Sequence, residues 1–214
     1  MLEENSKVTH YKIQNDSEKS FNIGTTQVIQ NANSSIESYV ISWGGELIRN
    51  NFNTFFKGKD SECYMNGIYL SKRNQLIDNH TLADHAVPNC YSNELYKGII
   101  DDNAGAVFNG KILVRQDAQK TNAYQSNKNI ILSEKADINS IPQLEIFADD
   151  VKCSHGATTG QLNPDELFYL RSRGIETEKA KTILLYAFLE EVIMNIKLAP
   201  LKEYLEKMLE KKLN

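Results

Sequence analysis

The segment Cys63-Tyr64-Met65-Asn66-Gly67-Ile68-Tyr69-Leu70 is rich in β-branched and aromatic residues and has little helical periodicity. Such composition is typical of β-strands. Similar segments occur on both sides of it, and several alternate apolar with polar residues, as half-buried strands do. The first part of the chain is therefore predicted to be mainly β. The other predicted strands are 8–13, 36–42, 104–108 and 112–114.

Asparagine is concentrated in this part of the chain, where 19 of the 22 asparagines lie before residue 160. The dipeptides Asn66-Gly67 and Asn109-Gly110 are predicted as turns. A sandwich, a barrel and a solenoid can all be built from many short strands. Long alternating strands and tight hairpin signals, which a sandwich needs, are few. Asparagine tolerates left-handed turns and can stack in ladders, so a parallel β-solenoid with about 20 residues per turn fits the composition.

After residue 160 the pattern becomes helical. Asn163-Pro164-Asp165-Glu166 predicts a helix start, with an asparagine cap, a proline in the first turn and a capping-box glutamate. Gly174 suits the end of this helix. Two further helices are predicted at about 177–197 and 201–213.

The helix predicted at 177–197 has so wide an apolar arc that it needs two neighbours. One can be the strand region, and the other is either the companion helices or another protein. This change of pattern divides the chain into a β domain, residues 1–160, and a small helical domain, residues 161–214.

Composition and charge exclude several classes of protein. With 214 residues, 41% hydrophobic and 24% charged, the chain is ordinary globular material. Its formal net charge of −4 and a pI near 5.6 argue against nucleic-acid binding. No apolar run approaches the ~20 residues of a membrane span. Three widely spaced cysteines, Cys63, Cys90 and Cys153, suit a reducing compartment, and we expect the cytoplasm.

The densest polar cluster is Asp149-Asp150-Val151-Lys152-Cys153-Ser154-His155-Gly156. If 151–155 is a strand, Cys153 and His155 point to one side. Thiolate and imidazole bind iron, zinc or copper, but two ligands do not complete a site, so others must come from elsewhere. The alternative is structural, because free cysteines are often buried and single histidines often only hydrogen-bonded. A Cys153 nucleophile with His155 as base is less favoured, because their side chains would be parallel and not convergent.

The pairs Asp101-Asp102 and Asp149-Asp150 raise a second hypothesis, a β-solenoid enzyme that acts on carbohydrates through aspartate carboxylates. Adjacent residues in a strand point to opposite faces, so neither pair is a ready acid–base pair, and solvated turns are the simpler interpretation. His80 and His85 flank Asp84, match no familiar metal spacing, and are interpreted as polar loop residues.

The run PQLEIFADDVKCSHGAT at 142–158 closely resembles the SufB/SufD family of iron–sulfur cluster assembly proteins. Three further segments are similar to the same family in the same order. The retained Cys153-Ser154-His155 favours the SufD branch, because the SufB branch has a different, glutamate-containing run there. Family members are longer at the N-terminus, so the chain resembles a C-terminal portion or a shortened member. The further segments are AVFNGK at 106–111, AQKT at 118–121 and LFYLRSRGI at 167–175.

The resemblance implies a right-handed parallel β-helix followed by a C-terminal helical domain. It implies a non-enzymatic scaffold subunit of the SUF system, whose β-helix pairs with that of SufB and whose helical domain docks the ATPase SufC. A transient iron–sulfur cluster would form at the SufB interface, with His155 and Cys153 as ligands and the rest supplied by SufB. The isolated chain would then hold no stable cluster.

The resemblance also implies that the helix at 164–173 faces SufC. Arg171 and Arg173 have a simpler alternative role, because arginines also stabilise the C-terminal end of a helix. When SufB is absent, two copies of the chain are expected to pair through exposed β-helix faces. The implied contacts with SufC are Leu167, Phe168, Leu170, Arg171 and Arg173.

Overall fold

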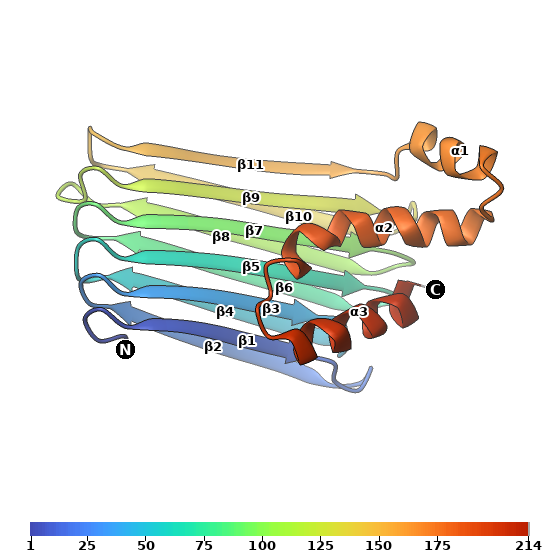
Figure 1. The fold of residues 1–214 in the computed structure, drawn as a ribbon, viewed down its shortest axis with the longest axis horizontal. Coiled ribbons are helices and arrows are strands. Elements are labelled where there is room, and N and C mark those ends of the chain that lie inside the picture. Colours follow the sequence, from blue (N-terminus) through green and yellow to red (C-terminus); the bar gives the residue numbers. More distant parts are fainter. Residues whose placement is uncertain (214) are drawn as a thin grey trace.

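The computed structural model describes residues 1–213, and within them eleven strands precede three helices (Figure 1). The strands are β1 (Lys7–Gln14), β2 (Phe21–Gln30), β3 (Ser35–Ser42), β4 (Leu47–Phe56), β5 (Glu62–Ser71), β6 (Leu76–His85), β7 (Tyr91–Ile100), β8 (Gly105–Val114), β9 (Asn122–Ile131), β10 (Asp137–Ile146) and β11 (Lys152–Gly160). They form two parallel sheets, an odd sheet in the order β1-β3-β5-β7-β9-β11 and an even sheet in the order β10-β8-β6-β4-β2. The chain alternates between the sheets, so it winds into a parallel β-helix of about five turns, and the predicted fold class is confirmed.

Each turn of the β-helix is longer than predicted. In the odd sheet Lys7 pairs with Ser35, Ser35 with Glu62, and Glu62 with Tyr91, which are 28, 27 and 29 residues apart. The prediction of about 20 residues per turn was wrong, because it assumed short strands. Each has 8 to 10 residues, and every turn contains two of them with two connecting segments.

The two predicted Asn-Gly turns lie inside strands. Asn66-Gly67 is in the middle of β5, and Asn109-Gly110 is in the middle of β8, which replaces two shorter predicted strands. Gly67 pairs with Tyr96 of β7, and a Cβ at Gly67 would lie 2.3 Å from two ring carbons of that tyrosine. The glycine therefore makes room for an aromatic ring from the neighbouring turn, and its role is not to reverse the chain.

Asparagine does occur in the turns, at one position that recurs from turn to turn. Two residues before each of five successive strands of the odd sheet, the backbone adopts the left-handed conformation, with φ between 57 and 62°. Asparagine and aspartate tolerate this conformation better than most residues, which agrees with the reason given for the solenoid prediction. The five positions are Asn5, Asn33, Asp60, Asn89 and Lys120.

Helices α1 (Pro164–Ser172), α2 (Thr177–Ile193) and α3 (Ala199–Leu213) follow β11 closely as predicted. The Asn163 side chain caps α1 by accepting a hydrogen bond from the Asp165 N–H at 2.9 Å. Gly174, with φ of +84°, ends the helix in a Schellman arrangement. No helix within residues 1–213 is long and apolar enough to cross a bilayer.

Two hydrophobic clusters lie on opposite sides of the odd sheet. One fills the inside of the β-helix and includes the fully buried Phe56 and Phe108. The other lies on the outer face, where α2 and α3 cover the sheet (Figure 1), and joins Leu189 of α2 to Ile68 and Ile99. The wide apolar arc of α2 is thus used largely within the chain, by the sheet and by α3.

The stacking of Tyr96 on Gly67 gives a test of the fold. Gly67→Ala should lower the free energy of unfolding by at least about 2 kcal/mol, because the new methyl group overlaps a ring in a tightly packed interior. Gly156→Ala, in β11, is the matched control, since a Cβ there would meet nothing within 4 Å. Chemical denaturation of the three proteins measures the effect, and equal stability of both variants would contradict this account of Gly67.

Candidate functional site

β11 forms one edge of the odd sheet. It pairs with β9, and no other strand within residues 1–213 pairs with its outer side. The backbone N–H and C=O groups along that side are therefore open to another strand, as at any free sheet edge. β11 also lies at the last turn of the β-helix, so its inward-facing residues have no further turn above them.

Cys153 and His155 both lie in β11 and face inward, as predicted for a strand there. Cys153 pairs with Ala123 and His155 with Gln125. The Cys153 side chain is half-buried against the inner cluster, and this burial raises the pKa of its thiol. His155 is exposed. The structure thus brings the two side chains to one face but gives them different surroundings, a packed thiol and an accessible imidazole.

The remaining cysteines are buried and distant from this edge. Cys63 stacks in the same inward column as Cys153 but lies three strands away, about 14 Å at the usual strand spacing. Burial raises the pKa of Cys63 and raises that of Cys90 to about 11. All three cysteines are free thiols. Among residues 1–213, no group of three His, Cys, Asp or Glu side chains is arranged to hold a metal ion.

A buried polar column connects this edge with the interior. Glu94 of β7 pairs with Gln125 of β9, which in turn pairs with His155 of β11, and all three face inward. Gln125 Nε2 donates a hydrogen bond to Glu94 Oε2 at 2.7 Å. Glu94 is 1% exposed, and burial raises its pKa to about 7. The sequence alone did not identify this column, because it depends on which residues of successive turns are stacked.

The acidic pairs lie in turns at opposite ends of the strands. Asp101-Asp102 follows the C-terminal end of β7, whereas Asp149-Asp150 precedes the start of β11. Parallel strands of ten residues separate these ends by about 33 Å. The two pairs therefore cannot act together on one glycosidic bond, for which catalytic carboxylates are about 5–10 Å apart.

The interpretation of the His80–His85 segment as a loop was wrong, since it forms part of β6. His80 Nε2 lies 2.8 Å from Asp78 Oδ1, and Asp84 accepts two hydrogen bonds from Arg115. His85 is fully buried, stacks on a phenylalanine ring and has its pKa lowered to about 3 by burial. These residues are held by structural contacts in and beside the even sheet.

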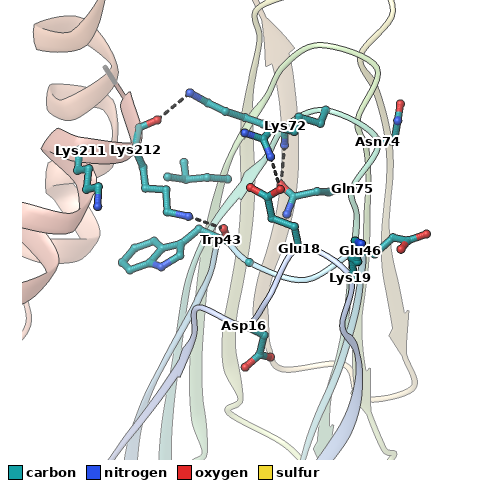
Figure 2. A pocket seen from close by; sticks show the side chains of 13 residues that line it. Asp16, Glu18, Lys19, Trp43, Glu46, Lys72, Asn74, Gln75, Lys211 and Lys212 are labelled. Atoms are coloured by element: carbon teal, nitrogen blue, oxygen red, sulfur yellow. Dashed lines mark hydrogen bonds and ion pairs between the residues drawn. The ribbon is translucent and has the colours of Figure 1, made fainter.

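A cleft of about 570 Å³ lies where the end of α3 meets the turns of the β-helix (Figure 2). Lys72 Nζ donates to the Lys212 carbonyl at 2.7 Å, and Lys212 Nζ donates to the Trp43 carbonyl at 3.3 Å. Arg73 is paired with Glu18. A lysine at the last carbonyls of a helix satisfies acceptors that lack an intrahelical partner. These contacts hold the C-terminal end of α3 against the β-helix, and the cleft is part of this internal interface.

α1 lies beyond the C-terminal end of β11 and has no buried residue (Figure 1). Phe168 is 72% exposed and Tyr169 is 56% exposed, which is unusual for large aromatic side chains. Leu167 and Leu170 are half-buried, and Arg171 is exposed. The guanidinium of Arg173 lies over the ring of Tyr169, 5.2 Å from its centroid.

These features define a β-helix protein with a free strand edge and a helical extension. Residues 1–188 match the family model described as "SUF system FeS cluster assembly, SufBD core domain". The chain therefore belongs to the SufBD family of SUF iron–sulfur cluster assembly proteins, which confirms the family resemblance.

Relatives agree with this assignment. The SufBD family protein slr0076 of Synechocystis sp. is 42% identical over 201 residues, which is 94% of this chain and 44% of that protein. SufD of Escherichia coli is 36% identical over 188 residues, 88% of this chain and 44% of that protein. Protein ABCI7, chloroplastic, of Arabidopsis thaliana is 38% identical over 196 residues, 90% of this chain and 41% of that protein. The chain spans less than half the length of these relatives.

The buried carboxyl group predicts an unusual pH dependence of stability. The folded pKa of Glu94, about 7, is above its ordinary value of 4.5, so the folded state binds this proton more tightly. The resulting stabilisation is complete below pH 4.5 and is lost as the pH rises towards 7. Glu94→Gln cannot ionise and avoids this loss.

We expect the wild type to lose about 2–3 kcal/mol relative to Glu94→Gln between about pH 5 and about pH 8. Denaturant unfolding of both proteins at the two pH values measures this difference. Other titratable groups are common to both proteins and largely cancel. A difference that does not change with pH would mean that Glu94 stays ionised in the fold.

Proposed function

We propose that this chain is a non-catalytic scaffold subunit of the SUF system that pairs with SufB through the β11 edge. The observation that carries the proposal is the free edge of β11 with Cys153 and His155 at the last turn. A free edge favours association by addition of a strand from a partner. Family membership supports an assembly role, and the pairing with SufB follows from the resemblance to the SufD branch.

In this proposal the iron–sulfur cluster is the cargo, and it forms where the two β-helices meet. His155 is exposed and can present a neutral ring nitrogen to iron without rearrangement of the chain. Cys153 is half-buried with a raised thiol pKa, so it must deprotonate and turn outward to serve as a ligand. We therefore assign His155 the principal role and Cys153 an auxiliary one, with the remaining ligands supplied by SufB.

The proposed helical domain, residues 161–214, would dock the ATPase SufC, while residues 1–160 would form the β-helix domain. Support comes from α1, where Phe168 is largely exposed and no residue is buried. Exposed aromatic and arginine side chains are enriched at the centres of protein interfaces. Leu167, Leu170, Arg171 and Arg173 complete the proposed contact.

The alternative, a carbohydrate-active enzyme, has less support, because the two acidic pairs lie at opposite ends of the strands. Free cysteines agree with a reducing compartment, and we propose the cytoplasm. We also propose that the chain alone holds no stable cluster, and that the β11 edge allows two copies to pair when SufB is absent.

The two candidate ligands should differ in their effects. In a complex co-expressed with SufB and SufC, His155→Ala should reduce the iron and sulfide bound per complex several-fold, whereas Cys153→Ala should reduce it less. The reverse is expected for thermal stability, because Cys153 packs against the inner cluster and His155 is exposed. Wild-type cluster content in His155→Ala would mean that His155 is not a functional ligand.

The docking surface can be tested without disturbing the fold. Phe168→Ala combined with Arg171→Ala should weaken binding to SufC by at least tenfold, because both side chains are exposed and held by no partner within the described chain. Phe21→Ala is the control, since Phe21 is similarly exposed but lies on β2. Binding is measured by titration calorimetry with purified SufC, and wild-type affinity of the double variant would remove α1 from the interface.

A further inference from the structure

Gln125 is held in one orientation by a buried carboxylate. Its Nε2 donates to Glu94 Oε2 at 2.7 Å, and the two residues are 4% and 1% exposed. Above about pH 7 Glu94 is ionised and can only accept hydrogen bonds, so the amide turns its NH₂ group towards it. The carbonyl oxygen of the amide is then directed away from Glu94.

Gly110 of the even sheet leaves space for this amide. A Cβ at Gly110 would lie 2.3 Å from Gln125 Nε2 and 2.8 Å from its Cδ. Any larger residue would displace the Gln125 side chain. The AVFNGK segment at 106–111, whose Asn-Gly pair was predicted as a turn, thus has a structural role beside the column that leads to β11.

The carbonyl oxygen of Gln125 is buried and has no hydrogen-bond partner among the described residues. Such an acceptor normally costs stability unless a donor is found for it. The next inward-facing residue in the column is His155, one strand away and about 4.8 Å between backbones. A neutral imidazole has one N–H donor and one nitrogen lone pair, so His155 can supply the missing donor.

We propose that Gln125, oriented by Glu94, is a positioning residue that selects the tautomer of His155, an inference that rests on the proposed ligand role of that histidine. In this proposal the His155 side chain, which does not bond to Oε1 in the structure, rotates so that the ring nitrogen facing Gln125 carries the proton and donates it to Oε1. The other ring nitrogen keeps its lone pair and faces the open edge, where it is ready to bind iron. An acceptor behind a metal-binding histidine fixes the ring in this way in many metal sites.

The tautomer of His155 can be measured in the isolated chain. Two-bond ¹H–¹⁵N correlation spectra of ¹⁵N-histidine-labelled protein distinguish the two tautomers, and His155→Ala assigns the His155 signals. The spectra are recorded at about pH 8.5, where Glu94 is ionised. We expect the tautomer ratio of the wild type to differ about fivefold from that of Gln125→Met, as one hydrogen bond provides. Gln125→Met has a similar volume but no acceptor oxygen.

Gln14→Met is the matched control. Gln14 is a buried glutamine of the same sheet, but it lies on β1 at the opposite edge and should leave the His155 tautomers unchanged. If Gln125→Met does not fold, Gln125→Leu replaces it, because it also removes the acceptor oxygen from the column. A wild-type tautomer ratio in whichever variant folds overturns the proposal.

The cluster measurement separates this inference from the proposed function. A tautomer shift in Gln125→Met together with normal cluster content in His155→Ala would leave the positioning contact intact and refute the ligand role. Unchanged tautomers together with cluster loss in His155→Ala would retain the ligand role and refute the positioning role of Gln125.

Discussion

The parallel register of the two sheets is the constraint on which the rest of this structure depends. Each residue of the odd sheet stacks on a partner 27 to 31 positions away in the chain. Strands about 4.8 Å apart leave little freedom, so each side chain must fit its counterparts in the neighbouring turns. The Tyr96 ring therefore requires Gly67, and the Gln125 amide requires both Glu94 and Gly110.

The β11 edge, where we propose the site, is a place where this stacking ends. In inner turns, the column of His155 continues through Gln125 and Glu94, which are buried. In β11 the same column reaches an exposed imidazole, and the column of Cys153 reaches a half-buried thiol. Side chains that would be core in any inner turn thus become accessible, next to backbone groups that can pair with a partner. For this reason the proposed pairing edge and the proposed ligands fall in one strand.

The helices make the two faces of the odd sheet different. α2 and α3 cover an apolar area of its outer face and are fastened there by contacts such as Lys72 with the Lys212 carbonyl. α1 is left outside this cluster, with Phe168 and Tyr169 in solvent. Because most of the apolar surface of α2 is used within the chain, α1 is the better candidate for a second protein than the arc of α2.

Local sequence determined the β character of the first part, the helices with the Asn163 cap and the Gly174 end, and a strand with Cys153 and His155 on one face. Each depends on residues a few positions apart, and family resemblance added the β-helix. Tertiary structure decided the length of a turn, the placement of Gly67 inside a strand, and the meeting of Glu94, Gln125 and His155. Apolar and polar residues that alternate along a strand show which face each residue occupies. This alternation does not specify which residue some 30 positions away will stack on it.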